Sequence, residues 1–310
     1  MSKYIFIFFG IATLLLSGIY TLLLKSNKKE KSSHTIVLIM RSYHPERLRI
    51  LSSFEQEILK HEKSEHLVLK SILKPSLQKL DLEKADLIVT IGNDDCGSYF
   101  NLPQLCLAVT KEFEKPSLKL EDSVTLLKNY ELLFGRKPVI YVSLKENEKN
   151  FNTHFSTTHW LKPLWIDSRV VSSVNSTLLQ EELERLMPAY GIIMARDDLL
   201  MDQVSILIKA AQKHNIPLGV MDQGSVSEGA SFSYSPSSDL IGQKGAQLAL
   251  KMLNSASENN NEPIYLNTKK IFYNQSLKAS KNGNMLELVQ YAKQHGVALI
   301  ELQTLARPNL

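Results

Sequence analysis

The fold is decided by the stretch 218–236, which reads Leu218-Gly219-Val220-Met221-Asp222-Gln223-Gly224-Ser225-Val226-Ser227-Glu228-Gly229-Ala230 and continues with Phe232-Ser233-Tyr234-Ser235-Pro236. Its apolar start, Leu218–Met221, predicts a buried β-strand that ends at Asp222. The Ser- and Gly-rich residues that follow are typical of a turn. The amphipathic pattern over Asp239–Leu253 predicts a helix. The stretch therefore predicts a strand, a polar turn, a short strand and a helix in succession.

Upstream, short apolar runs alternate with amphipathic stretches from His34 onward, as in repeated βα units around parallel sheets. The predicted strands are Thr35–Met40, His66–Leu69, Asp86–Ile91, Leu105–Val109, Val139–Val142, Leu164–Ile166, Gly191–Ala195 and Leu218–Met221. The predicted helices are Pro45–Lys60, Val124–Phe134, Leu178–Met187, Leu199–His214 and Asp239–Leu253. The charged segment Lys111–Glu121, which contains Pro116, lacks periodicity and predicts a crossing between two lobes of similar construction.

The chain has 310 residues, 44% of them hydrophobic and 22% charged, which excludes a disordered tail or a disulfide-stapled mini-protein. It is long enough for two α/β lobes of about 130 residues each. We expect lobe 1 to comprise residues 34–115 and 236–262, and lobe 2 residues 116–235 and 263–310, after an N-terminal segment 1–33. The net charge of only +4, without a localised basic stripe, excludes nucleic acid as a partner.

Aspartate pairs follow one predicted strand in each lobe. Asp94-Asp95 comes after the apolar run 85–91, and Asp197-Asp198 comes after the similar run 189–195. Because ligands in open α/β sheets bind beyond the carboxyl ends of the strands, these carboxylates are predicted to face one cleft. The alternative is that each pair only caps the helix that follows it, a role that Asp fills well.

With these features the sequence resembles the substrate-binding proteins of ABC-type importers, in the group with a periplasmic-binding-protein type I fold that includes tryptophan- and tyrosine-binding members. In that family a strand ending in Asp precedes a Ser-Val-x-x-Gly-Ala turn, a short strand and a Gly-containing helix that returns to the first lobe. The turn here is Ser225–Ala230. The helix carries the expected small and apolar residues Gly242, Gly245, Ala246, Ala249 and Leu253.

The resemblance is strongest over the last third of the chain and runs more weakly from Ile36 to Tyr273. It implies a two-lobed α/β fold in which each lobe is a parallel sheet flanked by helices. The chain departs from the family in three ways. The segment after Val109 is shorter and lacks a Gly-rich strand, the tail Ser276–Leu310 is additional, and no lipoprotein Cys is present.

The resemblance also implies which loops contact the ligand. Carried over position by position, the binding residues are Ser42, Tyr43, Asn93, Asp94, Ser143, Arg196, Asp197 and Asp222. The Asp222 carboxylate is suited to an ammonium group, and Arg196 to a carboxylate, so a zwitterion such as an amino acid is favoured over a sugar. The alternatives are that Tyr43 packs on the first helix, that His44 caps that helix before Pro45, and that Arg196 forms a salt bridge to Asp197 or Asp198.

The implied function is binding: two lobes close on a small solute, and a permease with its ATPase recognises the closed form. One alternative is a membrane-anchored ligand sensor, and another is a scaffold of degenerate lobes that binds no ligand. No phosphate-binding glycine loop follows any predicted strand, so we expect neither an enzyme nor a cofactor. We expect no metal either, because His154 and His159 are five residues apart and lack a carboxylate or Cys at ligand spacing.

The N-terminus predicts a membrane anchor, because Tyr4–Leu24 is an uncharged, almost wholly apolar run of 21 residues. A cleaved secretory signal is the alternative interpretation. Lys25, Lys28, Lys29 and Lys31 follow the run, and this basic flank places the body in the cytoplasm. The resemblance to exported binding proteins places it instead in the periplasm or outside the cell. The expectation is a single-pass protein of the inner (plasma) membrane with an exported body, and the conflict stays open.

The sequence contains two cysteines, Cys96 and Cys106. A disulfide between them is possible in an exported protein. We expect instead two separate buried thiols, because a helix predicted between them holds its two ends apart.

Overall fold

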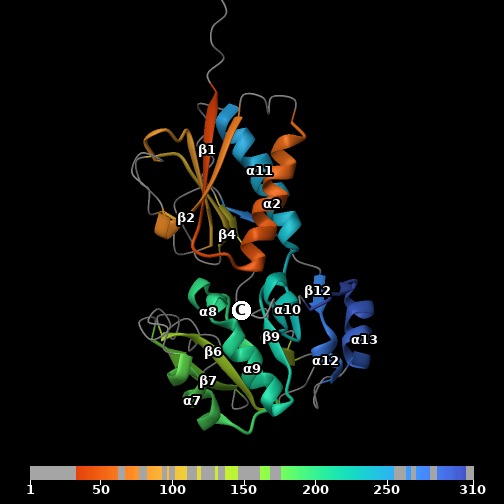
Figure 1. Cartoon of the computed structure of the whole chain (residues 1–310). Helices are drawn as coiled ribbons and strands as arrows, with labels where there is room; N and C mark the ends of the chain where they lie inside the picture. Colours follow the sequence, from red (N-terminus) through yellow and green to blue (C-terminus); the bar gives the residue numbers. More distant parts are fainter. Residues whose placement is uncertain are drawn as a thin grey trace, which may run out of the picture.

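The computed structural model describes residues 33–61, 67–76, 82–92, 96–97, 102–109, 117–119, 130–131, 137–145, 161–167, 176–254, 263–266, 270–279 and 285–304. Figure 1 shows two lobes, each built on a β-sheet with helices packed against it. No helix within these ranges is long and apolar enough to cross a membrane. The predicted anchor Tyr4–Leu24 lies outside the described residues, so it stays a prediction.

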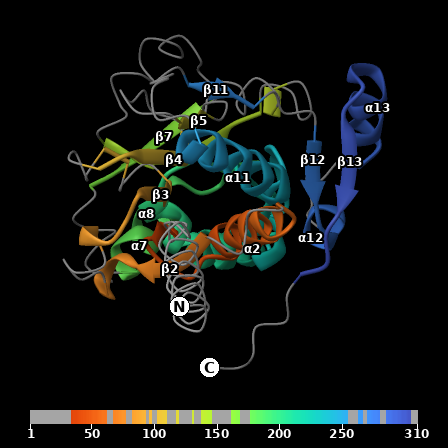
Figure 2. The ribbon, with the colours of Figure 1, turned by 90° about the horizontal axis from the view of Figure 1, so that it is seen from above.

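Lobe 1 contains a six-stranded sheet in the order β11-β5-β4-β3-β1-β2, with every neighbouring pair parallel. Its strands are β1 (His34–Met40), β2 (Leu67–Leu73), β3 (Leu87–Ile91), β4 (Gln104–Val109), β5 (Ser117–Lys119) and β11 (Ile264–Tyr265), and a short 3-10 turn spans Lys74–Ser76. Its helices α2 (Pro45–Leu59) and α11 (Ser238–Asn254) lie side by side against one face of the sheet (Figures 1 and 2).

Lobe 2 contains a seven-stranded sheet in the order β13-β12-β10-β9-β8-β6-β7, in which only the β10–β12 pair is antiparallel. Its strands are β6 (Val139–Leu144), β7 (Leu161–Ile166), β8 (Gly191–Met194), β9 (Leu218–Val220), β10 (Phe232–Tyr234), β12 (Lys270–Tyr273) and β13 (Ala298–Glu301). Its helices are α7 (Ser176–Leu186), α8 (Asp198–Asp202), α9 (Val204–His214), α10 (Gln223–Glu228), α12 (Gln275–Ala279) and α13 (Met285–His295).

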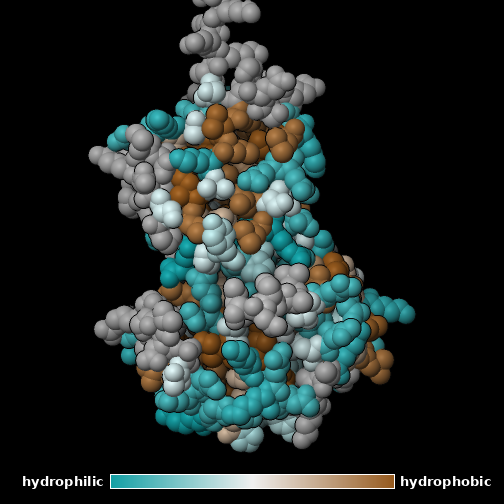
Figure 3. Space-filling view, in the orientation of Figure 1, coloured by the Kyte–Doolittle hydropathy of each residue, from teal (hydrophilic) through white to brown (hydrophobic). Residues whose placement is uncertain are grey.

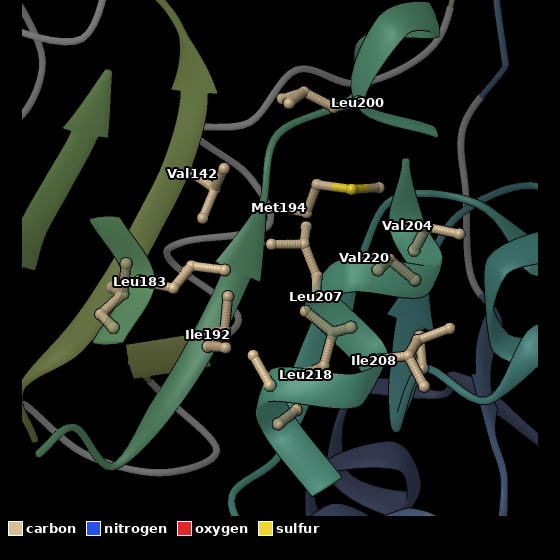
Figure 4. Packing of buried hydrophobic residues seen from close by; sticks show 14 of the residues in the cluster. Val142, Leu183, Ile192, Met194, Leu200, Val204, Leu207, Ile208, Leu218 and Val220 are labelled. Atoms are coloured by element: carbon tan, nitrogen blue, oxygen red, sulfur yellow. The ribbon is translucent and has the colours of Figure 1, made fainter. Parts of the chain in front are cut away.

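Each lobe buries its own apolar core. In lobe 1, side chains of β1, β3 and β4 pack against α2 and α11. The close approach of these helices needs glycine, since a Cβ at Gly242 would lie 2.4 Å from the backbone oxygen of Ile50. In lobe 2, apolar residues of α9, including Leu207 and Ile208, pack on those of β8 and β9 (Figure 4). The small residues predicted for α11 therefore serve helix packing.

The structure corrects the prediction at two helices. The predicted helix Leu199–His214 is divided into α8 and α9, because the backbone of Gln203 leaves the helical region at φ −108° and ψ 9°. The predicted turn after Asp222 is the short helix α10, which Gly229 ends with a φ of +126°. The predicted helix Val124–Phe134 lies outside the described residues except for two positions, 130 and 131.

The lobe boundaries differ slightly from the predicted ones. β5 and β11 fall within the residues assigned to lobe 2, yet both strands pair in the sheet of lobe 1. The chain tail beyond Ser276 continues lobe 2, where β13 adds a parallel edge strand beside β12. Seen from above, α12, α13 and these two strands lie along one side of the molecule (Figure 2).

The expectation of two separate thiols is wrong. Cys96 and Cys106 form a disulfide with a Cα–Cα distance of 5.5 Å. The reason is that Cys96 lies in the loop just after β3, whereas Cys106 lies in the neighbouring strand β4. Because Thr90 of β3 pairs with Cys106, the loop after β3 starts close to this position.

Candidate interlobe site

The N-terminus of α2 brings lobe 1 to lobe 2. Pro45 occupies the start of the helix, where its fixed φ favours helical geometry and no N–H is needed. The imidazole Nδ1 of His44 accepts a hydrogen bond from the backbone N–H of Glu46 at 3.2 Å. His44 therefore caps the helix, which confirms the alternative interpretation of this residue. The first helical turn then directs Glu46 and Arg47 toward α8 and α10.

Arg47 crosses from lobe 1 to lobe 2, and only 1% of its surface is exposed. Its Nη1 donates to Oδ1 of Asp202 at 2.6 Å, and its Nη2 donates to Oδ1 of Asp198 at 3.0 Å. Arg41 and Ser42, in the loop after β1, donate to the same Asp202 carboxylate at 3.0 and 2.6 Å. Two carboxylates of α8 are thus bound by donors of lobe 1. We call these five residues the arginine cluster.

Charge pairing outweighs burial in the arginine cluster. Burial by itself raises the pKa of Asp202, but Arg47, Ser42 and Arg41 together hold that pKa below its ordinary value. Burial lowers the pKa of Arg47, and the carboxylates of Asp198 and Asp202 more than reverse this effect. Arg47 and Asp202 therefore stay ionised at neutral pH.

A second group of buried polar residues joins α2 to α10. The Oε2 atom of Glu46 accepts hydrogen bonds from the backbone N–H of Gly224 at 3.1 Å and from Oγ of Ser238 at 2.7 Å. Its Oε1 atom is 3.9 Å from Nη2 of Arg196 and accepts no hydrogen bond from the described residues. Glycine is required at 224, since a Cβ there would lie 2.2 Å from the backbone nitrogen of Glu46.

Asp222 belongs to the same group. It is fully buried, its Oδ1 accepts from the backbone N–H of Ser225 at 2.6 Å, and its Oδ2 accepts from Ser225 Oγ at 2.7 Å. Ser225 Oγ also lies 3.4 Å from Nε2 of His44. Asp222 is therefore the N-cap of α10. We call Glu46, Asp222, Ser225, Arg196 and His44 the carboxylate cluster.

Burial dominates the titration of Glu46 and His44. Desolvation, followed by repulsion from Asp222, raises the pKa of Glu46 to about 7, although Arg196 and two hydrogen bonds act in the opposite direction. Desolvation also lowers the pKa of His44, against the attraction of Asp222. Glu46 thus exchanges a proton near neutral pH while it is buried between the lobes.

The predicted binding residues fall into three groups. Ser42, Arg196, Asp197 and Asp222 lie at the interlobe contact; Ser143 is buried in β6 and Tyr43 is 68% exposed; Asn93 and Asp94 lie outside the described residues.

The four residues at the contact all have protein partners. Besides the bonds given above, Arg196 Nη1 donates to the backbone oxygen of Met221 at 2.8 Å. Asp197 caps α8 by accepting from the N–H of Leu199 at 2.9 Å, as the capping alternative holds. Arg196 faces Glu46 and Met221 across a buried contact, a different arrangement from the salt bridge to Asp197 or Asp198 considered above.

Sequence reasoning missed Glu46, Arg47 and Asp202. One sign was available: Arg47 stands three and seven residues before Ile50 and Phe54, on the stripe of α2 that is otherwise apolar and buried. A charge on such a stripe requires a buried partner. The partner itself, on a helix 155 positions away, gave no sign in the sequence.

The surface reflects the polar character of this contact. On the face seen in Figure 3, the molecule narrows between the lobes and hydrophilic residues predominate at the narrow part. A cavity of about 520 Å³ lies instead at the opposite end of lobe 2. It is lined by Pro138, Lys162, Met187, Pro188, Ala189, Tyr190, His214 and Ile216. These residues lie at the amino ends of the strands, whereas ligands in such sheets bind beyond the carboxyl ends.

No model of a known protein family and no curated protein matches the chain. Solved structures do match. One is described as the ABC domain in complex with L-Trp from Streptococcus pneumonia, at 12% identity and a TM-score of 0.65, covering 81% of this chain and 99% of that one.

Two further structures broaden the comparison. The ligand-free, open structure of CD0873, a substrate-binding protein with adhesive properties from Clostridium difficile, is 18% identical at a TM-score of 0.56 and covers 87% and 100% of the two chains. An ABC-transporter solute-binding protein from Bacillus halodurans with bound myo-inositol is 8% identical at a TM-score of 0.51. The match covers 78% of this chain and 95% of that one. The chain thus has the type I periplasmic-binding-protein fold of ABC-transporter solute-binding proteins, which confirms the fold that the resemblance implies.

Proposed function

We propose that this protein is the solute-binding component of an ABC-type importer and traps a small ligand between its two lobes. The observation that carries the proposal is the meeting of loops from the carboxyl ends of both sheets. The loop after β1 in lobe 1 contacts residues that follow β8 and β9 in lobe 2. In this fold class the same edges enclose ligands, and closure on a ligand is the hinge motion that a membrane partner reads.

For the ligand we propose an amino acid or a related zwitterion. Support comes from the fold neighbour that contains L-Trp and from the juxtaposition of cationic and anionic groups at the interlobe contact. The neighbour that contains myo-inositol makes a polyol the alternative outcome. Because Asp222 and Arg196 already have protein partners, the ligand contacts that we propose shift toward Asn93, Asp94 and the exposed ring of Tyr43.

For the location we propose an inner (plasma) membrane protein anchored by residues 4–24, with its body in the periplasm or outside the cell. The Cys96–Cys106 disulfide supports an exported body, since disulfides persist in oxidising compartments and are rare in the cytosol. Protease added to intact spheroplasts should therefore digest the body. Digestion only after the membrane is permeabilised would place the body in the cytoplasm, as the basic flank of the anchor predicts.

The binding proposal is tested by thermal shift on the full chain in detergent, with the twenty common L-amino acids and a matched set of sugars and polyols. A ligand that binds only the folded state raises the melting temperature, and about 100-fold excess over Kd adds about 2.7 kcal/mol of stability. A response confined to amino acids supports the proposal that the ligand is a zwitterion. A response to polyols instead would identify a polyol as the ligand class. If no solute changes the melting temperature, the chain is a scaffold. Binding without uptake in membrane vesicles with the permease indicates a sensor.

A further inference from the structure

The arginine cluster is asymmetric between the lobes. All its carboxylates, those of Asp198 and Asp202, belong to α8 in lobe 2, and both its cations, Arg41 and Arg47, belong to lobe 1. Among the described residues of lobe 1, Arg47 hydrogen-bonds only to the hydroxyl of Ser42. When the lobes are together the charges are paired, and when they part every one of them must be hydrated by water instead.

The burial of the cluster makes its pairing critical. Arg47 is 1% exposed and the side chain of Asp198 is 8% exposed. An intact buried pair adds little net stability, because desolvation offsets attraction. The loss of Arg47 is a different case, since Asp198 and Asp202 then lose a buried cationic partner, while Asp202 keeps its ion pair with Arg41. Removal of Arg47 therefore penalises the joined arrangement of the lobes much more than the separated one, in which water reaches Asp198 and Asp202.

The loop after β3 adds to this contact. Gly92 has a φ of +107°, and a Cβ at this position would lie 2.4 Å from Oδ1 of Asp198. Asp198 thus lies between Arg47 and the backbone of the loop that continues into the predicted ligand residues Asn93 and Asp94.

We propose that Arg47 is a positioning residue that controls lobe closure: it neutralises Asp198 and Asp202 and so permits α8 to dock on lobe 1. Under the proposed function, ligand affinity follows from this role, because apparent affinity falls by the fraction of molecules able to close. The docking itself requires no ligand, so it is measured independently of the ligand's identity.

The test measures the distance between the lobes by pulsed electron spin resonance in the full chain. Spin labels are placed on non-natural keto residues at the exposed positions Gln56 of α2 and Gln212 of α9, which leaves the disulfide intact. The variants are Arg47→Gln and Arg47→Lys. Arg49→Gln is the matched control, since Arg49 lies on the same helix and forms no ion pair with the described residues.

We expect one short distance for the unmodified chain and for Arg49→Gln. Arg47→Gln should populate longer distances at least tenfold more, and Arg47→Lys should lie between. Neutralising the partners as well, in Arg47→Gln with Asp198→Asn and Asp202→Asn, should restore the short distance, which a merely structural role of Arg47 does not predict. If Arg47→Gln fails to fold by circular dichroism, Asp202→Asn alone, which leaves Arg41 and Arg47 with one carboxylate, must lengthen the distance.

Identical distances in Arg47→Gln and the unmodified chain would overturn the inference. So would separation in Arg47→Gln that neutralised partners fail to reverse. A chain that binds no solute but shows these distance changes contradicts the proposed function and leaves the role of Arg47 intact. A chain that binds amino acids while Arg47→Gln stays closed contradicts only the role of Arg47.

Discussion

Replacement of Glu46 by Gln should remove a pH dependence of stability that the native chain carries. Glu46 is buried, its pKa is raised from 4.5 to about 7, and its Oε1 accepts no hydrogen bond from the described residues. Because the native state holds the proton more tightly than the unfolded state, Glu46 favours the native state at low pH. This advantage is complete below pH 4.5 and is lost as the pH rises through 7.

The magnitude follows from the two pKa values. One pKa unit is worth about 1.4 kcal/mol, so ionising Glu46 costs the native state about 3 kcal/mol in full. Between pH 5 and pH 8 the cost grows by about 2–3 kcal/mol. Gln keeps the acceptor for Gly224 and Ser238 but cannot ionise. From pH 5 to pH 8, the free energy of unfolding of Glu46→Gln should therefore rise by this amount relative to that of the unmodified chain.

Urea unfolding of both chains at pH 5, 6, 7 and 8, followed by circular dichroism in detergent, measures the difference. The difference between the two chains is the informative quantity, because His44 also titrates in this interval. Its lowered pKa favours the native state at higher pH, but it does so in both chains. Parallel pH profiles for the two chains would refute the argument, since they would show that Glu46 ionises as easily in the native state as in the unfolded one.

Three further predictions concern other parts of the structure. Asp222→Ala should cost about 1–2 kcal/mol in urea unfolding, because it removes the cap that binds Ser225; an unchanged midpoint would contradict this role. Gly242→Ala should lower the melting temperature, because the added Cβ would meet the backbone oxygen of Ile50 at 2.4 Å. Such overpacking costs about 1–3 kcal/mol of folding free energy. Cys106→Ser should lower the free energy of unfolding by about 2–4 kcal/mol, because it removes the disulfide. In the unmodified chain, unfolded without a reducing agent, maleimide should label no thiol, and labelling there would contradict the disulfide.

The central strands were predictable because burial on both faces leaves a simple sequence pattern. β3 is an unbroken run of five buried residues, Leu87–Ile91, and its prediction is accurate to one residue. The edge strands were not. β7 begins at Leu161, three residues before the predicted start at Leu164, and so includes Pro163. A proline without an N–H is tolerated there because β7 is the last strand of its sheet.

The helix boundary at Gln203 shows a different limit. No Gly or Pro marks this position, and the apolar periodicity continues across it. What divides the helix is tertiary: α8 is capped by Asp197 and directs Asp198 and Asp202 to Arg47, while α9 packs in the lobe 2 core. A sequence pattern reports the face that a helix buries, but it does not report which distant charge the helix must meet.

The sequence predicted where the candidate site lies, but it did not predict which groups its side chains bind. The loops at the carboxyl ends of the strands do meet, since Ser42 and Asp222 both lie at the contact between the lobes. The individual roles depended on geometry at the level of single bonds. A carboxylate that follows a strand suits a ligand or a helix cap equally well, and only the position of Ser225 decides that Asp222 is a cap.

The polar nature of the interlobe contact is itself an argument for lobes that open. Each lobe has its own apolar core, whereas the contact that joins them is made by Arg47, Glu46, Asp198, Asp202 and Asp222. Separating apolar surfaces costs about 25 cal/mol for each Å² exposed to water, with nothing gained in return. Separating hydrogen-bonded charges exchanges protein partners for water, so the net cost is about 1.5–3 kcal/mol for each bond to a charged group. A contact of this composition holds the lobes in one specific arrangement and still lets them part, which is the balance that a hinged binding protein requires.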